Sequence, residues 1–349
     1  MQAFCASNVR LAFRTEVATG LRKRMRQHQD AHKISERLKK EQISALYHFT
    51  NVENLPGIAR LQALCSKQFL ESKGNWNQQT VPQPGGNDRS HQIDKEKGNW
   101  NFVSLTFTPN TPMAYRAKKA RHLCFLEFST HVALREGVVF TDSNAAHHAQ
   151  NHGAGITGLD LVNFSMVKSN PLPWDQDWVH QSQAEVMVPD CVGTESIRRV
   201  TFVSNASLKE GIRRWGDARR PKFEVDRAPF ADHPKSLRNI DFSHISEVFL
   251  LDTELTKETA MQTPKTRDKF KKKSGGVITA LVEARVLAGT KGRLKWNPGA
   301  MEDQVEFETS NEWRWWPSVS TDSLPIGPCS IEIWLNEVRW LTYPFQMVA

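Results

Sequence analysis

Short apolar segments separated by Gly, Pro and Asn constrain the fold of this sequence more than any other feature. No run reaches the eighteen apolar residues that a membrane-spanning helix needs. The pattern predicts strands at 44–50, 102–107, 123–128, 137–140, 184–188 and 197–203. Helices are expected from Asn54-Leu55-Pro56 and from Met113. Short strands mixed with few helices predict an α+β domain over residues 44–235.

The N-terminal segment, residues 1–43, is strongly basic. Residues 1–40 hold ten Lys or Arg against three Asp or Glu, although the whole chain has a net charge of only +8. Apolar residues recur every fourth position in this segment, which predicts a helix with an apolar seam and a basic face. Two interpretations stay open: a solvated surface helix, or an arm that attracts nucleic acid through Arg22, Lys23, Arg24 and Arg26.

Two further regions are less regular. Residues 71–100 are polar and rich in Gly, Pro and Asn, which predicts a functional loop or local disorder. A chain of 349 residues favours a second domain, expected at 236–349, where six of the eleven tryptophans lie. We predict an α+β unit there, with a strand at 248–251 and a helix at 277–287 that ends at Gly289. Its role cannot be assigned from the sequence.

The cysteines are five in number, far apart, and without CxxC or zinc-ligand spacing. This pattern indicates a reducing compartment and no structural metal. The N-terminus lacks the apolar core of a secretory signal, and its Arg-rich composition makes a mitochondrial presequence the weaker alternative. We therefore expect a cytoplasmic protein.

Separated motifs in residues 44–232 carry the strongest chemical signal. They are Leu46-Tyr47-His48-Phe49-Thr50 with Asn54-Leu55-Pro56-Gly57-Ile58, then Phe107-Thr108-Pro109-Asn110-Thr111-Pro112-Met113, Thr141-Asp142-Ser143-Asn144-Ala145, and Ala184-Glu185-Val186-Met187-Val188-Pro189-Asp190. In this order they resemble the DarT family, toxin enzymes that ADP-ribosylate bases of single-stranded DNA with NAD. The resemblance implies an ADP-ribosyltransferase-like mixed β core with flanking helices.

By this resemblance Glu185 is the catalytic carboxylate. Cleavage of the nicotinamide–ribose bond builds positive charge on the sugar, and a nearby carboxylate stabilises that charge. One glutamate suffices, because nicotinamide needs no general acid to leave. An acid inside an apolar strand is costly unless it is used or paired. The alternative is a strand residue that faces solvent.

The resemblance also assigns binding residues. The strand and helix start would hold NAD through Tyr47, His48, Phe49, Thr50 and Asn54. The acceptor base would contact Asn144, Trp174, Trp178 and His180, whose rings can stack an unpaired base. His48 can equally be a hydrogen-bonded core histidine, Asn144 a turn residue, and the tryptophans packing residues.

The family's NAD-contacting arginine has no clear match. Arg89 lies near the expected position, and Lys73 or Lys95 could supply the same charge. The family's Phe-x-Pro segment usually has an arginine where this chain has Asn110.

Taken together, the sequence predicts an enzyme that consumes NAD, needs no metal and modifies an unpaired base, because a stacked base hides its edge. DNA is favoured over RNA as the acceptor. By resemblance the protein is a toxin of a toxin–antitoxin or phage-defence system, with an antitoxin as partner and no membrane association. The alternatives are a catalytically impaired NAD- or nucleic-acid-binding module of the same fold and a transferase acting on protein.

Overall fold

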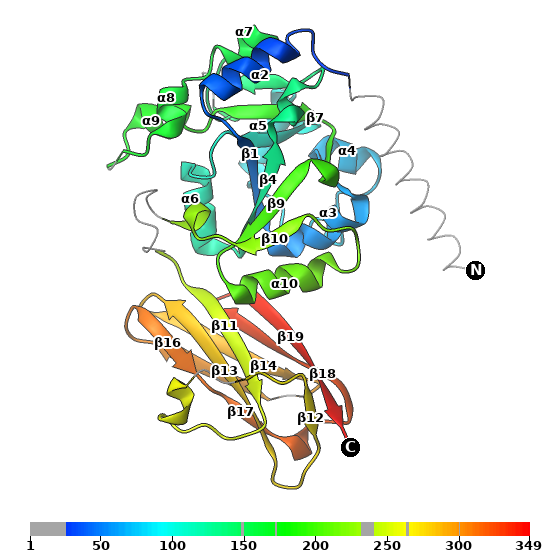
Figure 1. Cartoon of the computed structure of the whole chain (residues 1–349), viewed down its shortest axis with the longest axis vertical. Helices are drawn as coiled ribbons and strands as arrows, with labels where there is room; N and C mark the ends of the chain where they lie inside the picture. Colours follow the sequence, from blue (N-terminus) through cyan, green and yellow to red (C-terminus); the bar gives the residue numbers. More distant parts are fainter. Residues whose placement is uncertain (1–25, 148–149, 172, 232–240, 263–264, 300) are drawn as a thin grey trace, which may run out of the picture.

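The computed structural model describes residues 26–147, 150–171, 173–231, 241–262, 265–299 and 301–349. Figure 1 shows two parts: one holds a mixed sheet flanked by helices, and the other consists of two packed sheets. Helix α10 (Asn205–Trp215) lies between them. Among the described helices, none has both the length and the apolar composition required to cross a bilayer.

The first part is built on an eight-stranded sheet in the order β10-β9-β4-β1-β3-β7-β5-β6. Every neighbouring pair is antiparallel except the parallel pair β9 and β10. The strands are β1 (Ala45–Asn51), β3 (Phe102–Thr106), β4 (Leu123–Ser129), β5 (Val139–Thr141), β6 (His152–Ala154), β7 (Glu185–Pro189), β9 (Ile197–Phe202) and β10 (Lys222–Val225). A separate ribbon pairs β2 (Ala63–Cys65) with β8 (Cys191–Gly193). The strands expected from the sequence in this part are all present, with ends that differ by one or two residues.

Short helices surround this sheet. They are α2 (Ala31–Lys40), α3 (Leu55–Leu61), α4 (Lys67–Ser72), α5 (Asp88–Glu96), α6 (Pro112–Ala120), α7 (Gly155–Leu159), α8 (Phe164–Lys168) and α9 (Gln176–Gln181), with 3-10 turns η1 (Val52–Asn54), η2 (Asn99–Asn101), η3 (Thr130–Leu134), η4 (Thr194–Ser196) and η5 (Ala228–Phe230). Side chains of Ser66, Thr111 and Asp175 accept a backbone N–H at the starts of α4, α6 and α9. Such caps satisfy N–H groups that have no partner within the helix.

The basic N-terminal segment differs from the single helix that we expected. Gln27 forms an isolated bridge with Arg135, and α2 begins only at Ala31. Ile34 and Leu38 of the expected seam are buried in the core of the first part. The helix is therefore part of the folded domain. The exposed Arg26 is described, whereas Arg22, Lys23 and Arg24 lie outside the described residues.

Residues 71–100 are not one continuous irregular loop: a turn-rich stretch leads into helix α5 and the 3-10 turn η2. Helix α5 begins with a capping box between Asn87 and Ser90. Trp100 is buried and contacts the rings of Trp76 and His91. Aromatic packing thus gives this polar segment a small core, which its Gly and Pro content does not indicate.

The second part is all-β in its described residues, so the predicted α+β unit was wrong. One sheet holds β11 (His244–Leu251), β13 (Val277–Val286), β16 (Asn311–Trp315) and β17 (Ser318–Ser320); the other holds β12 (Lys269–Lys271), β14 (Thr290–Asn297), β15 (Glu302–Phe307), β18 (Gly327–Leu335) and β19 (Val338–Val348); η6 (Thr259–Met261) and η7 (Thr321–Ser323) are 3-10 turns. The expected helix at 277–287 is the central strand β13, which pairs with β11 and β16. A fully buried strand and a buried helix share the same continuous apolar pattern. Gly289, at φ +78°, turns the chain between β13 and β14.

The two parts share one hydrophobic cluster, which includes residues of β4, α6 and α10 together with the second part's strands. At its edge, Trp340 stacks on the buried His122 with ring centroids 4.3 Å apart. Glu53 lies 2.8 Å from Arg339 and 3.1 Å from Arg214. The second part is therefore held against the sheet that carries the candidate site.

Candidate functional site

The central sheet opens between β1 and β3. These strands are paired at a single position, Tyr47 with Thr106, whereas β1 pairs with β4 along its whole length. Beyond Tyr47, the edge of β1 that faces β3 therefore offers backbone groups for a ligand. Thr106 is in turn opposite Glu185 on β7. Directly opposite residues project from the same face of a sheet, so Tyr47, Thr106 and Glu185 form one row at this fork.

Glu185 is the first residue of β7 and is only 3% exposed. Its backbone N–H donates to the Thr141 hydroxyl at 3.0 Å, and its Oε2 atom has no hydrogen-bond partner. Burial raises the pKa of this carboxyl to about 7, and hydrogen bonding from the Ser104 hydroxyl opposes the rise. The alternative of a solvent-facing strand residue is thus wrong. A buried carboxylate with a free oxygen has the properties of a functional group.

The residues predicted to bind NAD come from β1 and from the start of α3, and their surroundings differ. His48 Nδ1 lies 3.0 Å from the Ser104 carbonyl oxygen, and burial lowers the pKa of His48. Phe49 is half-buried against Phe125. Only Tyr47, His48 and Phe49 lie next to the fork.

Thr50 and Asn54 are occupied with each other. The Asn54 amide donates to the Thr50 hydroxyl at 3.0 Å and to the Gln83 carbonyl at 2.7 Å, and its oxygen accepts from the Gln83 N–H. Both amide hydrogens are thus used within the protein. Asn54 anchors the segment before α5, and its predicted contact with NAD is not available in this structure.

Lys67, at the start of α4, is the cation beside the site, and the sequence analysis missed it. Its Nζ lies 2.7 Å from Asp94 Oδ2 and 4.6 Å from the centroid of the Trp100 ring. The ammonium lowers the pKa of both Glu185 and His48, and Asp94 raises that of Glu185. Lys67 precedes Asp94 by 27 residues, so no local pattern could have revealed the pair.

The other proposed cations are placed differently. Arg89 is exposed in the first turn of α5 and makes no described contact with Glu185 or His48. Lys95 lies 3.3 Å from Glu71, and its Nζ is 4.5 Å from the centroid of the Trp100 ring. Lys73 is exposed at the end of α4. Among these residues, the structure favours Lys67 for the electrostatic role.

The predicted acceptor residues fall into two groups. Trp178 is fully buried, and its Nε1 donates to the Ser169 carbonyl at 2.9 Å, so the prediction that it stacks a base was wrong. Trp174 is half-buried between Tyr115 and Trp178, with ring centroids 4.7 and 4.9 Å away. A partly exposed ring on an aromatic support remains available for stacking.

Asn144 lies in the loop that contacts Glu185 through Ala145, and His180 lies in α9, which ends four residues before Glu185 in the sequence. The Asn144 side chain accepts from the Ala146 N–H at 2.8 Å, the bond expected of a turn residue. His180 contacts the ring of His147 at a centroid distance of 4.1 Å. The same loop contributes a backbone hydrogen bond from Ala145 that lowers the pKa of Glu185.

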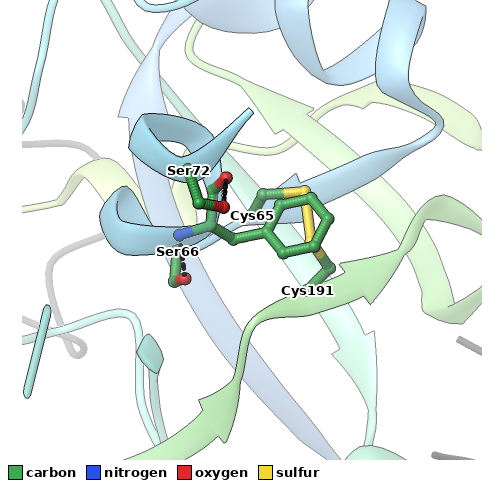
Figure 2. Close-up of a disulfide and its surroundings, with 5 residues drawn as sticks. Cys65, Ser66, Ser72 and Cys191 are labelled. Atoms are coloured by element: carbon green, nitrogen blue, oxygen red, sulfur yellow. Dashed lines mark hydrogen bonds between the residues drawn. A yellow bond between two sulfur atoms is a disulfide. The ribbon is translucent and has the colours of Figure 1, made fainter. Parts of the chain in front are cut away.

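Cys65 and Cys191 form a disulfide, which the cysteine spacing did not predict. They are opposite each other on β2 and β8, with Cα atoms 4.1 Å apart and a sequence separation of 126 (Figure 2). The neighbouring Ser66 caps α4 and donates its backbone N–H to the Asp190 carbonyl at 2.6 Å. The start of the Lys67 helix is thus joined to the end of the Glu185 strand.

In the described ranges, no group of three or more His, Cys, Asp or Glu side chains is arranged to hold a metal ion.

A comparison with protein families identifies the first part. The family described as "ssDNA thymidine ADP-ribosyltransferase, DarT" matches residues 47–233, more than half of the chain. The chain belongs to the DarT family. The predicted membership of this family is therefore confirmed, and the β-rich second part lies outside the match.

Individual relatives are distant. A DNA ADP-ribosyl transferase–DNA ADP-ribosyl glycohydrolase fusion protein of Thermosipho africanus is 23% identical over 178 residues, which cover 48% of this chain. The match spans 45% of that relative, so this chain corresponds to less than half of its length.

Solved DarT structures cover the same part of the chain. Thermus sp. 2.9 DarT in complex with ADP-ribosylated ssDNA is 17% identical, with a TM-score of 0.43, and the match covers 54% of this chain and 96% of that chain. Thermus sp. 2.9 DarT in complex with NAD+ is 20% identical, with a TM-score of 0.41, and the match covers 54% and 98%.

Proposed function

We propose that this protein transfers ADP-ribose from NAD to a base of single-stranded DNA, with Glu185 as the catalytic carboxylate. The observation that carries the proposal is the Glu185 carboxylate itself: it is buried at the fork of β1 and β3 and has one oxygen without a partner. The description of the family names thymidine in single-stranded DNA, and we take thymidine as the first acceptor to test.

The chemistry follows from where charge develops. The bond between the nicotinamide nitrogen and ribose C1″ breaks, and its electron pair neutralises the pyridinium as nicotinamide leaves. Ribose then carries the positive charge, and a fixed carboxylate beside it stabilises the transition state more than the ground state. A ring nitrogen of the base attacks C1″ and loses its proton. The ionised form of Glu185 is the active form.

NAD would enter at the fork. Backbone groups of Tyr47 to Phe49 on the open edge of β1 would bind the nicotinamide amide. The His48 ring, whose pKa is lowered by burial, is neutral at pH 7 and adds no repulsion toward the pyridinium. Lys67 would supply the positive charge that attracts the pyrophosphate.

The unpaired base would approach along the loop before Glu185. Trp174 is the ring available there for stacking. The Thermus structure named above contains ADP-ribosylated single-stranded DNA, which supports an acceptor of this kind. The relative from Thermosipho is named as a fusion with a DNA ADP-ribosyl glycohydrolase. We propose accordingly that this chain acts as a toxin, in a toxin–antitoxin or phage-defence system, and that its partner is an antitoxin that removes the modification.

The test incubates the protein with labelled NAD and matched random pools of single-stranded DNA, single-stranded RNA and duplex DNA. The proposal predicts label on single-stranded DNA with release of nicotinamide. Label on RNA alone would overturn the DNA acceptor and spare the mechanism. Equal labelling of duplex would remove the argument for an unpaired base, and release of nicotinamide without label on any pool would point to a protein acceptor or NAD hydrolysis.

We place this activity in the cytoplasm, where NAD and single-stranded DNA occur together. Disulfides are rare in that compartment, so the Cys65–Cys191 pair allows a direct check. Free thiols are titrated in denatured protein, once without and once with prior reduction. If the disulfide forms in the cell, the reduced sample should contain two more thiols. An equal count would show that both cysteines are reduced there.

A further inference from the structure

A cavity lies on the same face of the sheet as Glu185. Its lining includes Tyr47 of β1, Glu127 of β4, Thr201 of β9 and Asn110 of the turn after β3. Tyr47 is opposite Glu127, which continues the row of Thr106 and Glu185 across the sheet. Neighbouring strands are about 4.8 Å apart, so Tyr47 lies about 10 Å from Glu185 along this row. The cavity is therefore next to the site of chemistry.

The carboxylates around this cavity are paired with cations: Glu127 also lies 3.6 Å from Arg198, and Glu224 contacts Lys222. Arg199 is the cation in its lining, and its Nε donates to Glu127 at 2.6 Å. The same guanidinium contacts Glu224 and lies 3.6 Å from Asp226. Carboxylates already contact its Nε and Nη1 atoms, and the three acids around the guanidinium would repel a phosphate. The cavity is suited to an uncharged ligand.

Neutral polar groups in the lining remain without partners. The Thr201 side chain is 2% exposed, and its hydroxyl has no hydrogen-bond partner. Among the described contacts, neither the Tyr47 hydroxyl nor the Asn110 side-chain amide has a hydrogen-bond partner. A buried hydroxyl without a partner destabilises the folded protein unless a ligand satisfies it.

The rest of the lining is apolar apart from Asp226, the acid beside Arg199. Pro109, Ala228 and Pro229 supply these apolar walls, and the cavity has a volume of about 160 Å³. A cavity of about 150 Å³ accommodates one aromatic ring. Apolar walls with hydroxyl and amide groups at the edge match the faces and edge of a nucleobase, and an Asn amide pairs well with adenine.

We propose that this cavity binds a nucleobase during the reaction, with Thr201 and Asn110 as its hydrogen-bonding partners. The inference rests on the proposed function, which brings two sources of such a base: the adenine of NAD and a base of the acceptor strand next to the modified one. Both can reach the cavity, since its nearest wall, Tyr47, lies about 10 Å from Glu185, and Thr201 on β9 lies two strands further, roughly 20 Å away. The chemistry is the same for both, and the experiment separates them.

The test uses Thr201→Val, which keeps the shape of the side chain and removes the hydroxyl. Because that hydroxyl has no partner in the protein, the variant is expected to melt at the same temperature as the wild type or higher. The KM for one substrate is expected to rise about three- to tenfold, the loss of one hydrogen bond, with kcat nearly unchanged. Asn110→Ala should raise the same KM. Thr309→Val, in an exposed turn of the second part, is the matched control.

Two KM measurements, the two arms of the experiment, show whether the bound base is the adenine of NAD or a base of the acceptor strand. A rise in the KM for NAD at saturating DNA, with nicotinamide mononucleotide used equally well by variant and wild type, assigns the cavity to adenine. A rise in the KM for the oligonucleotide at saturating NAD assigns it to the acceptor strand. Unchanged KM values in both arms, with the wild type active and Glu185→Gln inactive, would overturn this inference alone. A lowered melting temperature for Thr201→Val would also overturn it, because the hydroxyl would then be bonded within the protein.

Discussion

Replacing Glu185 with Gln should make the folded protein more stable, and increasingly so as the pH rises. The carboxyl has a pKa of about 7 in the folded protein, against 4.5 ordinarily, because burial disfavours its charged form. Between these values the folded state holds the proton more tightly than the unfolded state does. The stability contributed by this group is therefore complete at low pH and is lost as the pH rises toward 7. Glutamine keeps the shape and does not titrate.

The size of the effect follows from the two pKa values. Their difference corresponds to roughly 3 kcal/mol in total, and about 2.5 kcal/mol of it falls between pH 5 and pH 8. Urea unfolding of both proteins at each pH measures the gap in unfolding free energy between them. All other titrating groups are present in both proteins, so their contributions cancel in the difference between the two unfolding free energies. The gap should widen by about 2.5 kcal/mol in favour of Glu185→Gln.

A control variant tests whether removing any carboxylate, buried or not, would give the same pH-dependent change in unfolding free energy. Glu308 is exposed on the second part, and Glu308→Gln should show the same gap at both pH values. If the gap between Glu185→Gln and the wild type also stayed constant within about 0.5 kcal/mol, the reasoning from burial would be refuted.

Four further results are expected. In a plot of kcat/KM against pH, Lys67→Gln should shift the rising, acidic side to higher pH, because the ammonium lowers the pKa of Glu185. Lys67→Arg should restore the wild-type profile. An unshifted profile for Lys67→Gln would remove Lys67 from the site. Deleting residues 1–25 should flatten the salt dependence of DNA binding, by about 0.7 in log–log slope per lost phosphate contact, with NAD affinity unchanged. Deleting residues 1–40 should unfold the domain, because it removes part of the core; a folded product would contradict the packing of α2. Trp178→Ala should lower the unfolding free energy by about 3–5 kcal/mol, whereas Trp174→Ala should mainly raise the KM for DNA.

The fold of the first part could be predicted largely because its strands are short and bounded by turn residues. Pro112 and the cap Thr111 mark the start of α6, and the motif strands around Tyr47 and Glu185 are where the residue pattern places them. The failure at 277–287 has a physical cause. Both faces of β13 are covered, because Ala280 and Val282 lie in the main core of the second part and Leu281 packs in a smaller cluster on the other face. The resulting continuous apolar pattern also fits a buried helix.

The candidate site could be predicted only in part. Glu185 and His48 lie within motifs, so the sequence could single them out. Lys67 and the Cys65–Cys191 pair depend on contacts between residues far apart in the chain, which no local spacing encodes. Trp174 and Trp178 lie in one motif with equal prospects for stacking, and only packing shows that the second is fully buried.

The most direct test of the central claim compares the wild type with Glu185→Gln on a thymidine-containing single-stranded oligonucleotide. Single-turnover transfer from saturating NAD is followed by the mass of the modified strand, and NAD affinity is measured separately by calorimetry. Loss of one fixed electrostatic contact is expected to slow transfer by at least ~10²-fold, with NAD affinity unchanged. Transfer by Glu185→Gln at the wild-type rate would contradict the assignment of Glu185 as the catalytic carboxylate.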